Sequence, residues 1–503
     1  MTVFVGCDLG TMGTKAAVID EEGGILGEAF EEVPLHSPRP GWVQQDLGEI
    51  EASAHHTIRA ALQMAGRPSR IGGLAFSGQM SGIGSIDRDF GPATHFDSWL
   101  DTRCEPYIER MSEHADRVTE LSGCPPTYSH APKILWWKEE RPEDFRRIAR
   151  FVVPGAYLAG RLTGLPAEQA FIDRTYLHFS NLSDTEAARW SPELMKTFGV
   201  EEGVLPRIVD PLDVVGEVTR EGEEATGLPA GTPVAAGAGD QAAASLGAGV
   251  VDPGQAFDSS GTASVFGICV DAFSPDVDHQ TFMATHSVIR GVYVALAFIN
   301  GGGLALRWFR DEVARLDPED RQVYARLDEL AQGIEPGAGT LLWFPHFQGR
   351  VLPPQPHARG CWIGLTSGHG LGHMFRAILE GVAYQYAEWA RLVQAYGSSP
   401  LHEARVLGGG ARSALWNQIK ADVLGIDWVP VARPDCGVMG DALIAAAATG
   451  HVGDLPAAAQ AWQETGAPFR TDQEHHVRYQ RLLAAYRELA EGIGPIFSSL
   501  GGG

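Results

Sequence analysis

The sequence predicts an α/β protein built from two similar lobes, and two observations support this prediction. A tract with a Gly-Thr pair, Asp8–Lys15, is followed about half of the 503 residues later by a second such tract, Asp258–Ser264. Short apolar runs also alternate with stretches of helical periodicity, which is typical of sheets layered with helices. In a chain long enough for two domains, this repeat indicates that each lobe carries its own hairpin loop.

The first lobe is expected to open with an antiparallel meander. Apolar runs at Val3–Val5 and Ala16–Ile19 flank the first Gly-Thr tract, and a turn then leads to a third strand at Ile25–Phe30. A helix is predicted over Glu49–Met64, and a buried strand over Ile71–Ser77. Sheet and helices therefore alternate from the beginning of the chain.

We place the domain boundary near residue 250, which predicts an N-terminal lobe over 1–250 and a C-terminal lobe over 251–495. Before the boundary, a buried strand at Val234–Gly239 meets a helix that runs to Gly247. After it, the periodicity predicts more helix than strand. The expected elements are helices over Gly303–Leu316, Gly372–Tyr396, Ser413–Leu424 and Asp435–Ala448, and a strand over Leu401–Leu407.

Composition excludes several classes of partner. The net charge of −24 argues against nucleic acid, because phosphate backbones recruit basic surfaces, and it disfavours anionic lipid. The six cysteines are scattered without a C-x-x-C pair, so a reducing, cytoplasmic location is the simplest interpretation. We expect no secretory signal, and we expect no membrane span, because no uncharged apolar run approaches the roughly 18 residues that a span needs.

The first Gly-Thr tract has the chemistry of a phosphate-binding loop. Its glycines permit close approach of the backbone, and its other residues supply hydrogen-bond donors. These residues are Gly10, Thr11, Gly13, Thr14 and Lys15. Asp8, at the strand end, is a candidate to hold Mg²⁺, which needs only one or two carboxylates. A plain hairpin turn is the alternative, but the similar tract at Gly261-Thr262 favours phosphate binding.

Asp240 stands where a strand passes into a helix. An aspartate at that position is often only an N-cap. Its functional interpretation is a general base that takes a proton from a substrate hydroxyl while the helix N-terminus faces an incoming phosphoryl group. From spacing alone, both interpretations remain open.

Two further groups of residues suit a small polar ligand. Gln79–Gly82 follows a buried strand, and Trp99–Arg103 offers an aromatic face beside charged groups that can bond vicinal hydroxyls.

Asn300–Gly303 and Gly408–Gly410 each precede a helix and let the backbone pass close to a base or ribose. Ordinary surface loops and flexible turns are the competing interpretations.

Taken together and in this order, these tracts resemble the FGGY carbohydrate kinases, and within them the xylulokinase-like branch. The likeness spans nearly the whole chain. It includes the tract Gly237–Gln241, the segment Leu407–Gln418, and a C-terminal signature over Gly360–Glu380. The resemblance implies two actin-like (ribonuclease H-like) lobes, each a mixed five-stranded sheet flanked by helices, with ATP held in a cleft between them.

The resemblance also implies roles for individual residues. Asp240 becomes the catalytic base and, with Asp8, a metal ligand, while ATP and Mg²⁺ are the expected cofactors. The sugar-binding residues are expected to be Gln79, Met80, Ser81, Trp99, Asp101, Arg103, Asp240 and Gln241. The ATP- and phosphate-binding residues are expected to be Gly10, Thr11, Gly13, Thr14, Lys15, Gly261, Thr262, Gly302, Gly409, Gly410 and Asn417.

Departures from the xylulokinase pattern bear on the sugar rather than on phosphoryl transfer. Ser81 stands where the branch usually has His, Leu100 stands where it often has Asn, and His130 and Trp137 are unusual in their tract. The resemblance implies D-xylulose as the acceptor. Because the changes at Ser81 and Leu100 remove polar contacts expected at the sugar, another ketose, a polyol or a sugar acid is the alternative. A non-catalytic sugar or nucleotide sensor and a chaperone-like ATPase are more distant alternatives. A homodimer is compatible with the resemblance.

Overall fold

The computed structural model describes residues 1–433 and 435–501, and the chain folds into two compact units. Unit 1 comprises 1–251, 272–294 and 435–463. Unit 2 comprises 252–271, 295–433 and 464–501 of the described residues. Each unit is thus assembled from separate parts of the chain, whereas the sequence analysis predicts two continuous pieces. The predicted boundary near residue 250 stays a prediction.

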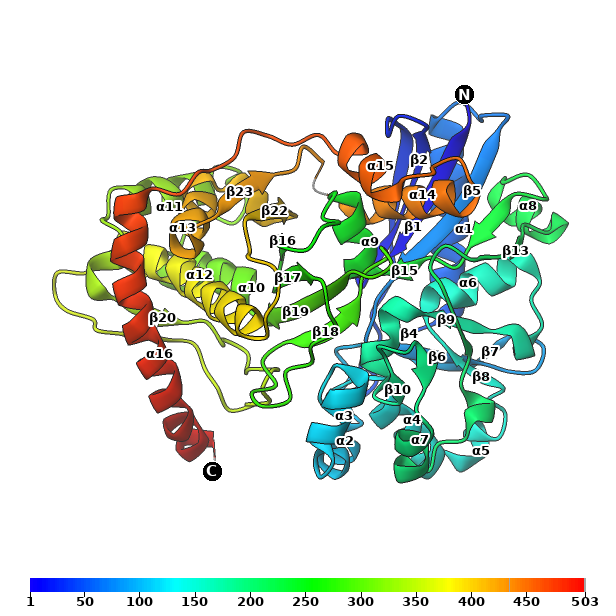
Figure 1. Ribbon diagram of the computed structural model, residues 1–503, viewed down its shortest axis with the longest axis horizontal. Helices are drawn as coiled ribbons and strands as arrows, with labels where there is room; N and C mark the ends of the chain where they lie inside the picture. Colours follow the sequence, from blue (N-terminus) through cyan, green and yellow to red (C-terminus); the bar gives the residue numbers. More distant parts are fainter. Residues whose placement is uncertain (434, 502–503) are drawn as a thin grey trace. The chain divides into compact units, whose positions relative to one another are not determined.

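Unit 1 is built on a mixed sheet whose strands run in the order β13-β14-β5-β1-β2-β3 (Figure 1). β1 pairs antiparallel with β2 and parallel with β5, and β15 continues the line of β14 along β5. Five strand positions match the expected sheet, and β13 adds an antiparallel edge. The strands are β1 (Val3–Leu9), β2 (Gly13–Asp20), β3 (Ile25–Glu32), β5 (Ile71–Gly78), β13 (Val214–Glu217), β14 (Pro233–Ala235) and β15 (Ala238–Gly239).

Helices cover both faces of this sheet. A Cβ on Gly6 of β1 would lie 2.0 Å from the carbonyl oxygen of Val438, so α14 (Cys436–Ala448) lies directly against one face. The neighbouring Cys7 bonds Thr57 of α1 (Leu47–Met64). Because successive strand residues point to opposite faces, α1 and α14 lie on opposite sides. α9 (Asp240–Gly247) packs beside α14.

The core of unit 1 joins distant parts of the chain. Phe4 and Ala17 of the first hairpin pack in one buried cluster with Val438 and Leu443 of α14 and with Trp462. A smaller four-stranded sheet in the order β4-β7-β6-β8 adjoins a second apolar cluster. Its strands are β4 (Gln44–Gln45), β6 (Ile83–Ile86), β7 (Pro92–Asp97) and β8 (Arg150–Val152).

Unit 2 repeats the same strand arrangement. Its strands follow the order β19-β17-β16-β22-β23, and β16 pairs antiparallel with β17 and parallel with β22, as β1 does with β2 and β5. The expected five strand positions are therefore present. They are β16 (Gln255–Ser260), β17 (Ser264–Val270), β19 (Tyr293–Ile299), β22 (Glu403–Leu407) and β23 (Asp427–Pro430). The first two residues of β19 are assigned to unit 1.

Three of the helices predicted for the second half of the chain lie in unit 2, whereas α11 (Val323–Gln332) is not among the predicted helices. α12 (Leu371–Ala395) and α13 (Ala414–Leu424) match the predictions closely. The helix predicted over Gly303–Leu316 is present as α10 (Gly302–Trp308) followed directly by a π-helical segment at Phe309–Val313, so it ends three residues earlier than predicted.

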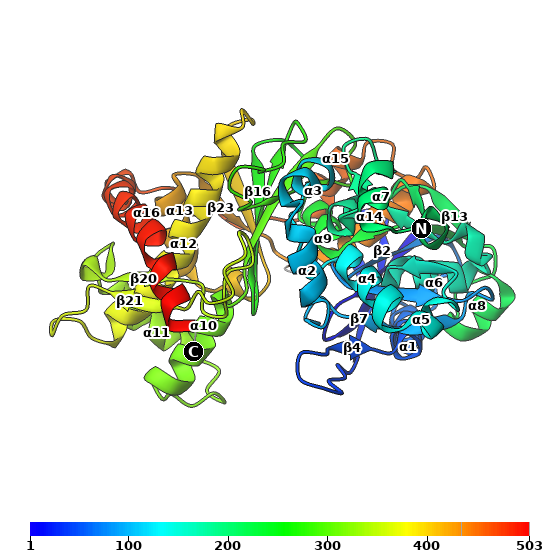
Figure 2. The ribbon, with the colours of Figure 1, turned by 90° about the horizontal axis from the view of Figure 1, so that it is seen from below.

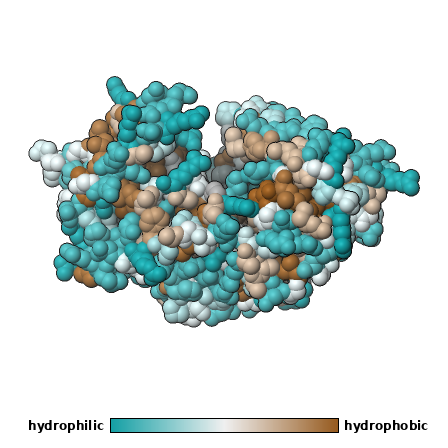
Figure 3. All heavy atoms as spheres, turned by 90° about the horizontal axis from the view of Figure 1, so that it is seen from above, coloured by the Kyte–Doolittle hydropathy of each residue, from teal (hydrophilic) through white to brown (hydrophobic). Residues whose placement is uncertain are grey.

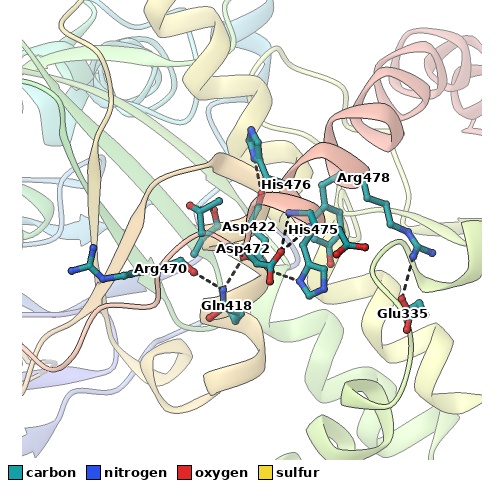
Figure 4. A network of polar contacts seen from close by, with 12 residues as sticks. Glu335, Gln418, Asp422, Arg470, Asp472, His475, His476 and Arg478 are labelled. Atoms are coloured by element: carbon teal, nitrogen blue, oxygen red, sulfur yellow. Dashed lines mark hydrogen bonds and ion pairs between the residues drawn. The ribbon is translucent and has the colours of Figure 1, made fainter.

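A long C-terminal helix, α16 (Gln473–Gly501), lies beside α12 and α13 in unit 2 (Figures 1 and 2). Its first turn is fixed to α13 by Asp422, whose carboxylate accepts from the backbone N–H of Asp472 at 2.9 Å and lies 3.0 Å from Nδ1 of His475 (Figure 4). Arg478, one turn further on, bonds Glu335 at 3.2 Å.

The surface is mainly hydrophilic on the face that Figure 3 draws. Scattered apolar patches lie between the hydrophilic residues. Among the described residues, none of the helices is both long and apolar enough to cross a membrane.

Candidate active site

Three carboxylates of unit 1 gather where β1, β5 and α9 meet. The hydroxyl of Ser77 on β5 lies 3.2 Å from Oδ1 of Asp8 and 2.9 Å from Oδ2 of Asp441 on α14. Asp240 begins α9 directly after β15, which pairs with the end of β5. The negative charge of Asp8 acts on both Asp240 and Asp441, so the three groups form one electrostatic cluster.

Asp240 has the properties of a proton acceptor. Burial raises the pKa of its carboxyl to about 7, and the charge of Asp8 adds to the effect. The backbone N–H of Gln241 donates to Oδ1 at 2.6 Å, which opposes the shift in part. A carboxylate with a pKa near the working pH suits general base catalysis.

Asp8 and Asp441 are also held against their preference for water. Burial raises the pKa of Asp8, although its bond with Ser77 and the charge of Lys15 oppose this. Asp441 is fully buried, and burial raises its pKa well above the ordinary value. Asp441 is not among the predicted site residues, because it stands in an alanine-rich tract whose sequence is typical of a structural helix.

The first Gly-Thr loop is tied to the predicted sugar residues. The indole of Trp99 donates to Oγ1 of Thr11 at 2.9 Å, and that hydroxyl is 3.3 Å from Oε1 of Gln79. Gln79 in turn donates to Gln45 at 2.8 Å. The space beside Gly10 is narrow, because a Cβ added there would lie 3.2 Å from the carbonyl oxygen of Gly13. These bonds bring Thr11, Gln79 and Trp99 together.

Other residues of that tract are engaged elsewhere in unit 1. Thr14 is buried and its hydroxyl lies 2.6 Å from that of Ser53 in α1. Lys15 forms an ion pair with Asp435. Gly13 lies against Phe30, where a Cβ would be 2.7 Å from the ring. Their roles at a phosphate stay predictions.

Met80 lies next to the candidate base. A Cβ on Gly239 would lie 2.5 Å from Cε of Met80, so Met80 packs directly against the residue before Asp240. Nε2 of His130 is 2.8 Å from the carbonyl oxygen of Met80. Ser81 points its hydroxyl to the carbonyl oxygen of Tyr128 at 2.9 Å. The unusual His130 therefore contacts a predicted sugar residue.

Asp101 and Arg103 are bonded chiefly to each other. Nη2 of Arg103 lies 2.7 Å from Oδ2 of Asp101, and both side chains are at most 1% exposed. Arg103 also covers the Trp42 ring at 4.0 Å, and Asp101 accepts from the backbone of Val43 at 2.6 Å. The pair holds β4 near β7, and a role for it at a sugar stays a prediction.

Thr175 and Tyr176 position the strand that leads to Asp240. The hydroxyl of Thr175 accepts from the backbone N–H of Gly239 at 2.9 Å. The Tyr176 hydroxyl lies 3.0 Å from the carbonyl oxygen of Gly78 and 3.3 Å from that of Ala238. Neither residue is among the predicted site residues, because a Thr-Tyr pair outside any motif gives no signal in the sequence.

In unit 2, the predicted nucleotide residues gather at the end of β16. A Cβ on Gly302 would lie 2.0 Å from Oγ of Ser264, so α10 begins directly against the second Gly-Thr turn. The backbone N–H of Leu304 donates to the carbonyl oxygen of Thr262 at 3.1 Å. The predicted Gly302 thus lies beside Thr262.

The third glycine loop reaches the same strand end. A Cβ on Gly410 would lie 2.4 Å from Cβ of Ser260, and Asn417 donates to the carbonyl oxygen of Ala411 at 3.0 Å. Gly261 and Gly409 differ, since a Cβ on either would meet no atom closer than 3.8 Å. Packed glycines thus bring the loops together, while Gly261 and Gly409 leave room for a ligand.

Few carboxylates are available for a metal. In the described part of the chain, no group of three His, Cys, Asp or Glu side chains has the arrangement of a metal site. Mg²⁺ takes most of its ligands from water and phosphate, so the half-buried Asp8 and Asp240 fit the one or two carboxylates it needs.

Comparison with known proteins identifies the family. Residues 3–247 match the N-terminal domain of the FGGY family of carbohydrate kinases, and residues 257–449 match its C-terminal domain. The chain belongs to this family and is a sugar kinase.

Relatives extend over nearly the full chain. The sequence is 27% identical over 499 residues to a xylulose kinase of Bacillus subtilis, covering 97% of each chain. It is also 27% identical over 509 residues to a gluconokinase of the same organism, covering 99% of this chain and 95% of the relative. The crystal structure of a xylulose kinase from Rhodospirillum rubrum matches with a TM-score of 0.90 at 26% identity, covering 98% of this chain and 99% of that one.

Proposed function

We propose that this chain transfers a phosphoryl group from ATP to a hydroxyl of D-xylulose, giving xylulose 5-phosphate. The observation that carries the proposal is Asp240, a carboxyl with a pKa of about 7 at the start of α9, directly beside Met80. Similarity to xylulose kinases over nearly the whole chain supports this acceptor. The equally similar gluconokinase supports a sugar acid as the alternative.

Asp240 would take the proton of the attacking hydroxyl. In phosphoryl transfer the base mainly orients the nucleophile and accepts its proton, which a carboxylate can do. Gln79, Met80, Trp99 and the backbone before Asp240 would orient the sugar. The buried Met80 and Gly239 limit access of water to the base, and water would compete with the sugar for the phosphoryl group.

ATP and Mg²⁺ are the proposed cofactors. Gly261, Thr262, Gly302, Gly409, Gly410 and Asn417 of unit 2 would bind the nucleotide, and Gly10, Thr11, Gly13, Thr14 and Lys15 of unit 1 would bind its phosphates. Asp8 and Asp240 would hold Mg²⁺, which supplies charge neutralisation at the phosphates. We further propose a cytoplasmic location and a homodimer, and light scattering on the purified protein tests the dimer.

A screen of phosphate acceptors tests the proposal. Release of ADP is measured with D-xylulose, other ketoses, polyols and gluconate at equal concentrations, with Asp240→Asn as the blank. We expect the highest kcat/KM for D-xylulose. A higher value for gluconate or a polyol would move the assignment to that acceptor, and ATP binding without turnover on any acceptor would favour a sensor.

A further inference from the structure

A cavity of about 600 Å³ lies within unit 2, apart from the residues assigned to the nucleotide. Its walls come from α12, from α16 and from the loop of residues 350–358. Ligand pockets for small molecules commonly have volumes of about 300–1,000 Å³, so this one is large enough for a phosphorylated sugar. None of the predicted site residues lines it.

Three arginines line this cavity in a protein with a net charge of −24. They are Arg350, Arg391 and Arg487, and the carboxylates in the lining are Glu388 and Glu491. Glu491 is exposed, so water screens its charge. The cavity therefore has an excess of positive charge on an otherwise acidic protein.

Arg350 is the unusual member of this set. Its Nε donates to the carbonyl oxygen of Leu352 at 2.9 Å, and no carboxylate of the described residues lies within ion-pair distance of it. Burial lowers the pKa of its guanidinium. A mostly buried cation without an anion is costly, and a bound anion would remove that cost.

The loop that carries Arg350 is fixed in place. The backbone N–H of Arg350 donates to the carbonyl oxygen of Gln355 at 3.0 Å, and the N–H of Gln355 donates back at 2.8 Å. Arg350 also lies close to Tyr486 and His346, and its charge lowers the pKa of His346 further after burial. The guanidinium is thus preorganised beside α16.

The other two arginines share one carboxylate. Nε of Arg487 lies 2.5 Å from Oε1 of Glu388, and Nε of Arg391 lies 3.2 Å from Oε2. No bond engages their terminal Nη groups among the described residues. Planar guanidinium groups with free terminal nitrogens are well suited to phosphate oxygens.

The rest of the lining suits a polyol. Gln355 and Gln385 supply amide groups for hydroxyls, and Pro354, Pro356 and Phe497 supply apolar walls. We propose that this cavity binds a phosphate monoester of a small sugar, with Arg350 as the main phosphate ligand. The inference does not depend on which sugar the active site phosphorylates.

Isothermal titration of the full chain tests this site. The probes are inorganic phosphate, D-ribose 5-phosphate and unphosphorylated D-ribose. We expect ribose 5-phosphate to bind more tightly than inorganic phosphate, and ribose not to bind. Arg350→Met is expected to weaken ribose 5-phosphate binding at least tenfold, while KM for ATP stays unchanged.

The matched control is Arg478→Met, which removes an arginine from the same helix as Arg487 but outside the cavity. It should leave ribose 5-phosphate binding unchanged. If Arg350→Met fails to fold, Arg391→Gln is the second variant, and it must weaken the binding of ribose 5-phosphate. This variant should fold, because Glu388 still has its ion pair with Arg487. Equal binding by the wild type and by both cavity variants, or a second copy of the chain covering the cavity in solution, overturns the proposal.

Discussion

The β1–β2 hairpin of unit 1 and the β16–β17 hairpin of unit 2 occupy equivalent places in their sheets. They differ in the charges that surround the aspartate of the central strand. Each central strand pairs antiparallel with its hairpin partner and parallel with the next strand. Asp258 on β16 has an ion pair with the fully buried Lys420. Asp8 on β1 instead faces further carboxylates, at Asp240 and Asp441.

Asp258 is neutralised and fully bonded. In addition to Lys420, it accepts from Tyr386 at 2.8 Å and from Ser260 at 2.6 Å. Lys420 also stands over the Trp416 ring at 3.7 Å. This network fixes the end of β16 next to the second Gly-Thr turn, so its role is to hold the loop.

The carboxylate oxygens of Asp8 and Asp441 have fewer hydrogen-bond donors around them than they could accept from. The Ser77 hydroxyl has one hydrogen and lies within bonding distance of both Asp8 and Asp441, and Oδ1 of Asp441 has no bonding partner among the described residues. One hydroxyl hydrogen cannot be donated fully to both carboxylates, so Asp8 and Asp441 compete for it. Unit 1 therefore keeps buried carboxylates together at the place where we propose that Asp240 accepts a proton.

The largest expected effect is on turnover. Asp240→Asn should lower kcat by about 10²–10⁴-fold, the usual contribution of a general base. Folding should be preserved, since asparagine has the same shape. Initial rates of ADP release check this, with Asp89→Asn, an exposed residue of unit 1, as the control. Near wild-type turnover in Asp240→Asn would reject the assignment of the base.

The next effect concerns the stability of unit 2. Lys420→Met should lower the free energy of unfolding by about 3–5 kcal/mol, because it leaves Asp258 buried and unpaired. Lys15→Met, which removes a partly exposed ion pair from unit 1, should cost less than about 1 kcal/mol. Urea denaturation compares the two, and similar losses would contradict the contrast between the hairpins.

The pH dependence of the free enzyme follows from Asp240. Its folded pKa of about 7 means that the base is protonated below that pH. We expect kcat/KM to fall about tenfold per pH unit below pH 7 and to level off above it. Rates between pH 5 and 9, measured with sugar and ATP both well below their KM values, check this, because such rates report the free enzyme. Full activity at pH 5 would show that the pKa of the base is not raised.

The smallest effect is a gain in stability. Burial raises the folded pKa of Asp441, so its contribution to stability is present below the ordinary carboxyl pKa and is lost as the pH rises. Asp441→Asn should therefore be more stable than the wild type at pH 8. The difference should shrink toward pH 4. Thermal unfolding at both pH values checks it, and a destabilised variant at pH 8 would contradict it.

The main features that could be predicted from sequence were those with local signals. The glycines of both hairpin turns and the strand-to-helix passage at Asp240 depend on neighbours in the chain, and their elements lie where the sequence places them. Asp441 and Lys420 could not be found this way. Their importance comes from partners more than 150 residues away, Ser77 and Asp258, and from burial that helix periodicity does not show.

The same limit applies to Asp101 and Arg103. Their residue types and position after a strand predict contact with hydroxyls, and this stays a prediction. The structure adds that they bond each other and that Val43 and Gln44 bond them as well, which the sequence does not show. A sequence pattern identifies a polar side chain, but it does not show which groups that side chain bonds in the folded protein.

The position of α14 in unit 1 has a consequence for biosynthesis. The hydrophobic cluster under the first hairpin is closed by residues 438–446 and Trp462, although most of its strand residues precede residue 251. During translation, the apolar cluster of unit 1 therefore cannot be completed until some 200 further residues have left the ribosome. Its apolar surface stays exposed to water during that time. A fragment ending at residue 250 would retain that exposed face and precipitate.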